Sequence, residues 1–203
     1  MAATDILFDP ESYYATKRTE VTVREPAFLL LVIIGSGVLT AGIQTQTVTE
    51  TTAATGSTVI LVGASSVLAA VFAPVLSLVG YSVLMFALAR LQGGVGGFRL
   101  TLKLVGLGFL PKVLGSLCVL GGTFVALQSI PAGIETTTEF VNRLEAHPAR
   151  RVSRTLNTVF LVWSGFLWIF AVKSAHEIDL RRAAVTAGLP TLAGIGLGVA
   201  SLL

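Results

Sequence analysis

The chain has 203 residues, of which 53% are hydrophobic and only 12% are charged, and its formal net charge is +3 at pH 7. Because a soluble domain carries about 25% charged residues, this composition argues against a soluble domain. The 14 Lys and Arg residues lie at the ends of apolar blocks and form no single patch, which argues against nucleic acid as a partner and is typical of membrane anchors.

Long apolar blocks follow one another along the chain. A bilayer core about 30 Å thick needs roughly 20 helical residues, so most of these blocks are long enough to cross it. We therefore predict an all-α fold, a polytopic bundle of about five transmembrane helices in a cell membrane, with the N-terminus in the cytoplasm and the C-terminus outside. The predicted spans are about 26–45, 58–90, 110–130, 155–172 and 183–203.

The first 25 residues are acidic in part and have no apolar core, so we expect a cytoplasmic segment and no cleaved signal peptide. The first span starts at Pro26, a residue that is tolerated at the first helical position. The Thr-rich stretch 44–58 has no Lys or Arg, which is typical of a loop on the translocated side.

The second block, 58–90, is longer than one crossing requires and contains Pro74. It is either one span with a kinked or interfacial extension, or two separate crossings that give six spans in all. Five spans place most of the Lys and Arg residues in the cytoplasm, whereas six spans divide them almost evenly. The positive-inside rule therefore favours five spans.

Between the third and fourth spans, Thr136 and Glu139 have capping-box spacing, and apolar residues follow on one side of a helix. We expect a short amphipathic helix on the outer membrane surface, with Pro148 as its stop.

The sequence predicts no catalytic residue, no metal site and no cofactor, so we do not expect an enzyme. His147 and His176 fall on opposite sides of the predicted membrane, and His176-Glu177 lacks the second His of a zinc-protease motif. The glycines at 93–97 miss the spacing of a phosphate-binding loop, and we interpret them as a flexible turn between two helices.

Cations near this turn are candidates for contact with lipid or with a partner. Arg99 and Lys103 are four residues apart and share a helix face, which indicates a basic interfacial helix that can pair with anionic headgroups. The same surface is predicted to include Arg90, Arg181 and Arg182. Lys112 either lies deep in the bilayer, as a functional group, or snorkels from the start of the third span, and we favour snorkelling.

Small residues in several spans predict close helix packing. The packing positions that we predict are Gly106, Pro111, Gly194, Gly196 and Gly198. The last three lie in the fifth span, where they could serve a homo-oligomer, another membrane-protein partner or the bundle itself.

Three stretches resemble the Yip-one domain family, named for Ypt-interacting proteins. They are FDPESYY at 8–14, ARLQGGVGGFRLTLKLVGLGFLP at 89–111 and AHEIDLRRAAVTAGLP at 175–190. The resemblance covers nearly the whole chain and implies five spans, a cytoplasmic N-terminus and a non-catalytic role in membrane organisation, trafficking or partner recruitment. The family's eukaryotic Asp-Leu-Tyr-Gly-Pro segment is absent and Leu107 stands where a Tyr often occurs, so binding of a Rab-type GTPase is not carried over.

Our leading hypothesis is a multi-pass scaffold that meets anionic lipid or an acidic partner through its basic surface. One alternative is a small transporter or channel that uses the proline-broken spans and Lys112. Another is an accessory subunit of a larger membrane complex.

Overall fold

The computed structural model describes residues 5–51, 56–131 and 136–200, and every regular element in these ranges is a helix. The all-α prediction is therefore confirmed for this part of the chain. The helices are α1 (Asp5–Phe8), α2 (Pro10–Glu20), α3 (Arg24–Thr51), α4 (Gly56–Leu91), α5 (Phe98–Leu107), α6 (Leu110–Gln128), α7 (Thr137–Ala146), α8 (Pro148–His176) and α9 (Leu180–Ala200).

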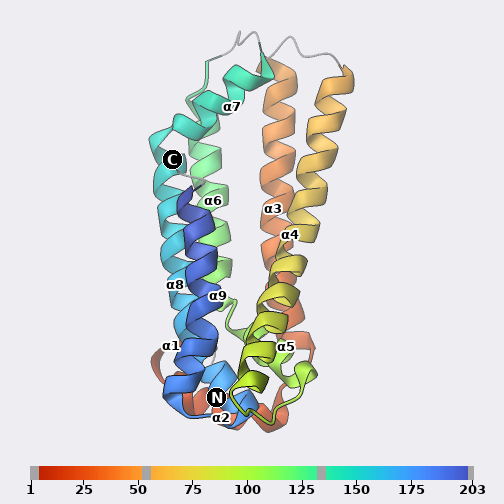
Figure 1. Ribbon diagram of the computed structural model, residues 1–203. Coiled ribbons are helices and arrows are strands. Elements are labelled where there is room, and N and C mark those ends of the chain that lie inside the picture. The colour runs from red at the N-terminus through yellow and green to blue at the C-terminus, as the bar shows by residue number, and fades with distance from the viewer. Residues whose placement is uncertain (1–4, 52–55, 132–135, 201–203) are drawn as a thin grey trace.

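The long helices run side by side, and the short ones gather at the two ends of the bundle (Figure 1). We use "the base" for the end formed by α1, α2, α5 and the adjoining ends of α4, α8 and α9. At the opposite end α7 leads into α8 (Figure 1). The lengths and apolar composition of the long helices predict that the bundle axis crosses the membrane.

Within the described residues, four helices are long and apolar enough to cross a membrane, which makes this a multi-pass arrangement. They are Arg24–Glu50, Val59–Leu91, Leu110–Gln128 and Pro148–His176. Helix α9 has 21 residues and runs beside α8 (Figure 1). Its role as a fifth span and the orientation of the termini remain predictions.

The second apolar block is one continuous helix, α4, with Pro74 in its interior. A Pro in this position removes one backbone hydrogen bond, yet the helix continues on both sides of it. The alternative of two separate crossings in this block is therefore not what the chain adopts, and the block provides one candidate span.

The stretch after the glycine turn contains two helices. Gly108 ends α5, and α6 begins at Leu110 with the buried Pro111 in its first turn. Pro is well placed there because an N–H in the first turn has no partner within the helix. Lys112 consequently lies in the first turn of a candidate span.

The predicted amphipathic helix is α7. The Thr136 hydroxyl caps it by accepting a hydrogen bond of 3.2 Å from the Glu139 N–H. The helix ends at Ala146, just before Pro148, as predicted, and His147 is its C-cap. Pro148 is also the first residue of α8. A Pro at the first helical position starts a helix as readily as it ends the preceding one.

Most of the largest fully buried side chains lie toward the base, and Phe140 of α7 is buried at the opposite end. Tyr14 of α2 packs with Leu104 and Leu107 of α5 and with Leu167 of α8. Trp168 is fully buried beside them, and its Nε1 donates a hydrogen bond of 2.9 Å to the carbonyl of Val105.

Polar contacts attach the N-terminal helices to this core. Lys17 pairs with Glu25 at 2.6 Å, Lys173 pairs with Glu11 at 2.5 Å, and Arg18 pairs with Glu177. The hydroxyl of Ser174 donates to the Tyr14 carbonyl at 2.9 Å. The N-terminal segment is thus folded against α3 and α8.

Candidate functional site

The glycine turn between α4 and α5 is held in place by the end of α8. Gly94 and Gly96 are buried, and a Cβ on Gly96 would overlap the backbone carbonyl of Ala175. The Val95 N–H donates to the His176 carbonyl at 3.2 Å, and the His176 Nε2 lies 2.8 Å from the Thr101 hydroxyl. The turn is therefore a packed junction, and its glycines permit close approach of two backbone segments.

All five predicted surface cations lie at the base, but they are not equally available. Lys103 donates to the Val21 carbonyl at 3.1 Å, Arg90 to the Gly94 carbonyl at 3.2 Å, and Arg182 to the Gln92 carbonyl at 3.1 Å. Arg99 and Arg181 are exposed, and neither forms a hydrogen bond or ion pair within the described ranges.

A groove of about 480 Å³ lies beside Arg99 and Lys103. Its walls are apolar side chains from the start of α3, from α4 and from α5. The apolar lining residues are Val23, Pro26, Ala27, Leu30, Leu78 and Leu102. The groove thus combines apolar walls with two cations, and none of the described residues that line it is acidic.

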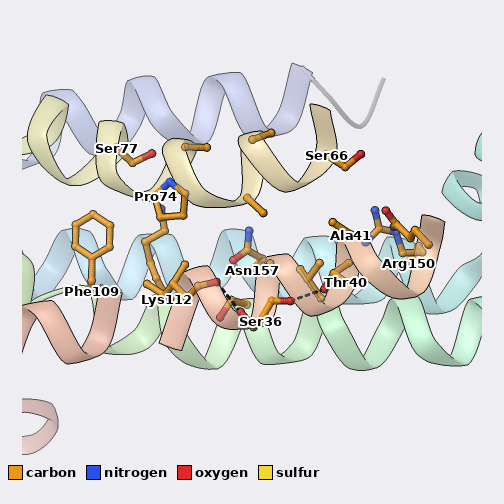
Figure 2. Close-up of a pocket in the computed structure, with 18 residues that line it drawn as sticks. Ser36, Thr40, Ala41, Ser66, Pro74, Ser77, Phe109, Lys112, Arg150 and Asn157 are labelled. Atoms are coloured by element: carbon orange, nitrogen blue, oxygen red, sulfur yellow. Dashed lines mark hydrogen bonds between the residues drawn. The ribbon is translucent and has the colours of Figure 1, made fainter. Parts of the chain in front are cut away.

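A second cavity, of about 520 Å³, lies between α3 and α4 on one side and α6 and α8 on the other, and it is more open than the groove. Lys112 extends from α6 into this cavity toward Pro74, as Figure 2 shows. Its Nζ lies 5.1 Å from the ring centre of Phe109 and 5.9 Å from that of Tyr81. Snorkelling of Lys112, which we favoured, stays a prediction. In the structure its side chain lines this cavity between the two helix pairs.

Arg150 also lines this cavity, at the end opposite to Lys112 (Figure 2). It donates to the Thr123 hydroxyl at 2.7 Å and to Glu145 at 3.0 Å, so its charge is compensated. Sequence reasoning missed this residue, because the predicted fourth span began only at about residue 155. The early start of α8, at Pro148, brings it into the bundle.

The predicted packing positions differ in their surroundings. A Cβ on Gly106 would lie 2.5 Å from the Cβ of Pro26, and one on Gly194 would overlap the Tyr81 hydroxyl. Gly196 has open space around it. The surroundings of Gly198 lie outside the described residues.

No group of three or more His, Cys, Asp or Glu side chains suited to a metal occurs in the described ranges. His147 and His176 stand at the two ends of the 29-residue helix α8. The two histidines are therefore not part of one site.

The helix bundle and its apolar spans define a class: this is an all-α, multi-pass membrane protein. The model of the Yip1 domain matches residues 4–202, and the chain belongs to that family. The resemblance that the sequence indicated is therefore confirmed. Searches of curated proteins and of solved structures found no match to the chain. The Yip1 family consists of membrane proteins that interact with other proteins and is not known for enzymatic activity.

Proposed function

We propose that this chain is a non-catalytic membrane-organising protein that holds anionic lipid, and through it a partner, at its base. The groove beside Arg99 and Lys103 is the observation that carries this proposal. On this proposal the base faces the cytoplasm, where the inner leaflet supplies anionic headgroups.

The chemistry of the groove fits an anionic phospholipid. An acyl chain would lie against Ala27, Leu30 and Leu78, and the phosphate would meet the exposed Arg99. Lys103 uses one N–H for the Val21 carbonyl, which leaves two donors on its ammonium group. Each cation near an anionic surface contributes about 1 kcal/mol.

The packed base supports a scaffold role. Ion pairs hold α2 to α3 and α8, so the base presents a fixed surface to a partner. A recruiting surface gains affinity when it is already ordered, because less conformational entropy is lost on binding.

The test is a count of lipids retained by the purified protein. Native mass spectrometry would compare phosphatidylglycerol with phosphatidylcholine for the wild type and for the double variant Arg99→Glu, Lys103→Glu. We expect the wild type to retain phosphatidylglycerol preferentially and the double variant to lose this preference. An unchanged preference in the double variant would reject the proposal.

The matched control is Arg143→Glu, a charge reversal at the opposite end of the bundle, where Arg143 is half exposed and pairs with Glu139. This control should keep the wild-type preference. A pull-down from native membranes with the same variants then asks whether a partner depends on the groove.

A further inference from the structure

The cavity around Lys112 combines an uncompensated cation with polar side chains. Among the described residues no Asp or Glu lines it, and Lys112 forms no ion pair with any of them. The Tyr81 and Phe109 rings stabilise the ammonium group through their electron-rich faces, but they do not neutralise its charge. A lysine inside a membrane-spanning bundle is costly, so such a residue marks a functional site by default.

Polar groups face the cavity from both walls. Ser77 and Ser66 lie on α4, and Asn157 lies on α8 (Figure 2). Within the described ranges none of these three side chains has a hydrogen-bond partner. Their hydroxyl and amide groups can therefore donate to a ligand without breaking an existing contact.

The size of the cavity suits a small ligand or a lipid headgroup. Its volume of about 520 Å³ is in the range of ligand sites, which is roughly 300–1,000 Å³. Its walls come from two helix pairs, so a bound group would connect α3 and α4 with α6 and α8. A cation is an unsuitable occupant, because Lys112 would repel it and no described carboxylate lines the cavity to offset that repulsion.

We propose that this cavity binds an anionic oxygen group, a phosphate or a carboxylate, with Lys112 as the charge partner and Ser77 and Asn157 as further donors. The group belongs either to a lipid that enters from the bilayer or to a soluble anion. This site is separate from the groove at the base, and the proposal does not depend on the function assigned to that groove.

The experiment measures thermal unfolding of the detergent-purified full chain with added ligand. The probes are inorganic phosphate, as the soluble anion, and phosphatidylglycerol, as the lipid, with phosphatidylcholine as the neutral comparison. The variants are Lys112→Met, which keeps the length of the side chain without its charge, and Lys112→Arg, which keeps the charge. With phosphatidylglycerol they are compared in the Arg99→Glu, Lys103→Glu background, so that lipid held by the groove at the base does not contribute.

We expect phosphate or phosphatidylglycerol to stabilise the wild type and Lys112→Arg, and to bind Lys112→Met at least about tenfold more weakly. Without ligand, Lys112→Met should unfold at a higher temperature than the wild type, because it removes an uncompensated charge. Stabilisation by phosphatidylglycerol alone identifies a lipid headgroup, and stabilisation by phosphate alone identifies a soluble anion.

Two outcomes overturn the proposal: neither anion stabilises the wild type, or the stabilisation is the same in Lys112→Met. Should Lys112→Met fail to fold, Ser77→Ala serves as a second variant on the opposite wall and should weaken binding by a smaller factor. The double variant Arg99→Glu, Lys103→Glu should leave this binding unchanged, so that failure at one site is distinguished from failure at the other.

Discussion

The base differs from the parts of α3 and α4 beyond it, which we call the arm, in how much of each is buried within the chain. At the base, Tyr14, Trp168 and His176 are fully buried in contacts within the chain. In the most apolar window of α4 only 6% of the residues are buried, against 33% in α8. Figure 1 shows the parts of α3 and α4 that lie far from the base together on one side of the bundle, away from α8 and α9. Nearer the base α4 meets α8, where the ring centres of Tyr81 and Trp168 are 4.7 Å apart.

This difference indicates which part of the molecule is held by contacts within the chain and which part depends on its surroundings. The base is stabilised by particular hydrogen bonds and ring contacts within the chain, so its stability does not depend on surrounding lipid. The arm presents Leu61, Leu68 and Phe72 outward, a surface suited to acyl chains or to another membrane helix. Substitutions should therefore destabilise the base much more than the arm.

The largest effect is expected from Trp168→Ala. The variant removes the hydrogen bond to the Val105 carbonyl and the contacts with Tyr81 and Phe109, whose ring centres lie 4.7 and 5.3 Å from that of Trp168. We expect the free energy of unfolding to fall by about 3–5 kcal/mol. Circular dichroism during thermal unfolding in detergent measures the change.

The control for Trp168→Ala is Leu61→Ala in the arm, where the side chain is 72% exposed. It should change the unfolding temperature little, because detergent covers the side chain at this position in the folded and unfolded states alike. Equal losses in the two variants would show that the arm and the base do not differ as described.

The next effect is expected from Gly96→Ala in the glycine turn. An added methyl group would overlap the Ala175 carbonyl, so the turn must move away from α8 at a cost of about 1–3 kcal/mol. The matched control is Gly97→Ala, since nothing lies within 4 Å of a Cβ at Gly97 and its φ of −92° suits any residue. If both variants unfold at the same temperature, the close approach at Gly96 is not important for stability.

A smaller, local effect is expected from alkaline pH at the N-terminal helices. Burial raises the pKa of the Tyr14 hydroxyl well above its ordinary range, and the hydrogen bond with Glu25 raises the pKa of the Lys17 ammonium group. Both contributions to stability are complete below the unfolded pKa values of about 10 and are lost as the pH rises through the folded values. Limited proteolysis should therefore release α1 and α2 at high pH.

Tyr14→Phe separates the two groups. The Tyr14 hydroxyl is buried without a hydrogen-bond partner among the described groups, so Phe keeps the packing and removes the titration. We expect cleavage of the variant to begin at a higher pH than cleavage of the wild type. The same onset in both proteins would assign the effect to Lys17 alone.

Much of the fold could be predicted from the sequence, because apolar block length and helix-capping residues act locally. The N-terminus of α7 at Thr136 and that of α6 near Pro111 are examples. The contacts of the turn glycines could not be predicted, since the burial of Gly96 depends on Ala175, which lies far along the chain. The same reason applies to Lys112. The neighbouring Pro111 indicated that a helix starts here, but only the packing of four helices shows that Lys112 faces a cavity.

The smallest effect is expected from Thr136→Ala, at the end of the molecule where α7 joins the arm to α6. The variant removes the hydrogen bond to the Glu139 N–H and should destabilise α7 by about 1 kcal/mol. Phe140 and Leu144 of α7 pack with Val48 of α3 and Ala126 of α6, so fraying of α7 should also loosen the tip of the arm.

Hydrogen exchange measures both segments in one experiment, and Thr138→Ala is the control because Thr138 is exposed and makes no capping bond. Faster exchange in α7 and at the end of α3, with no change at the base, is the expected pattern. Faster exchange at the base as well would mean that the two regions unfold as one unit.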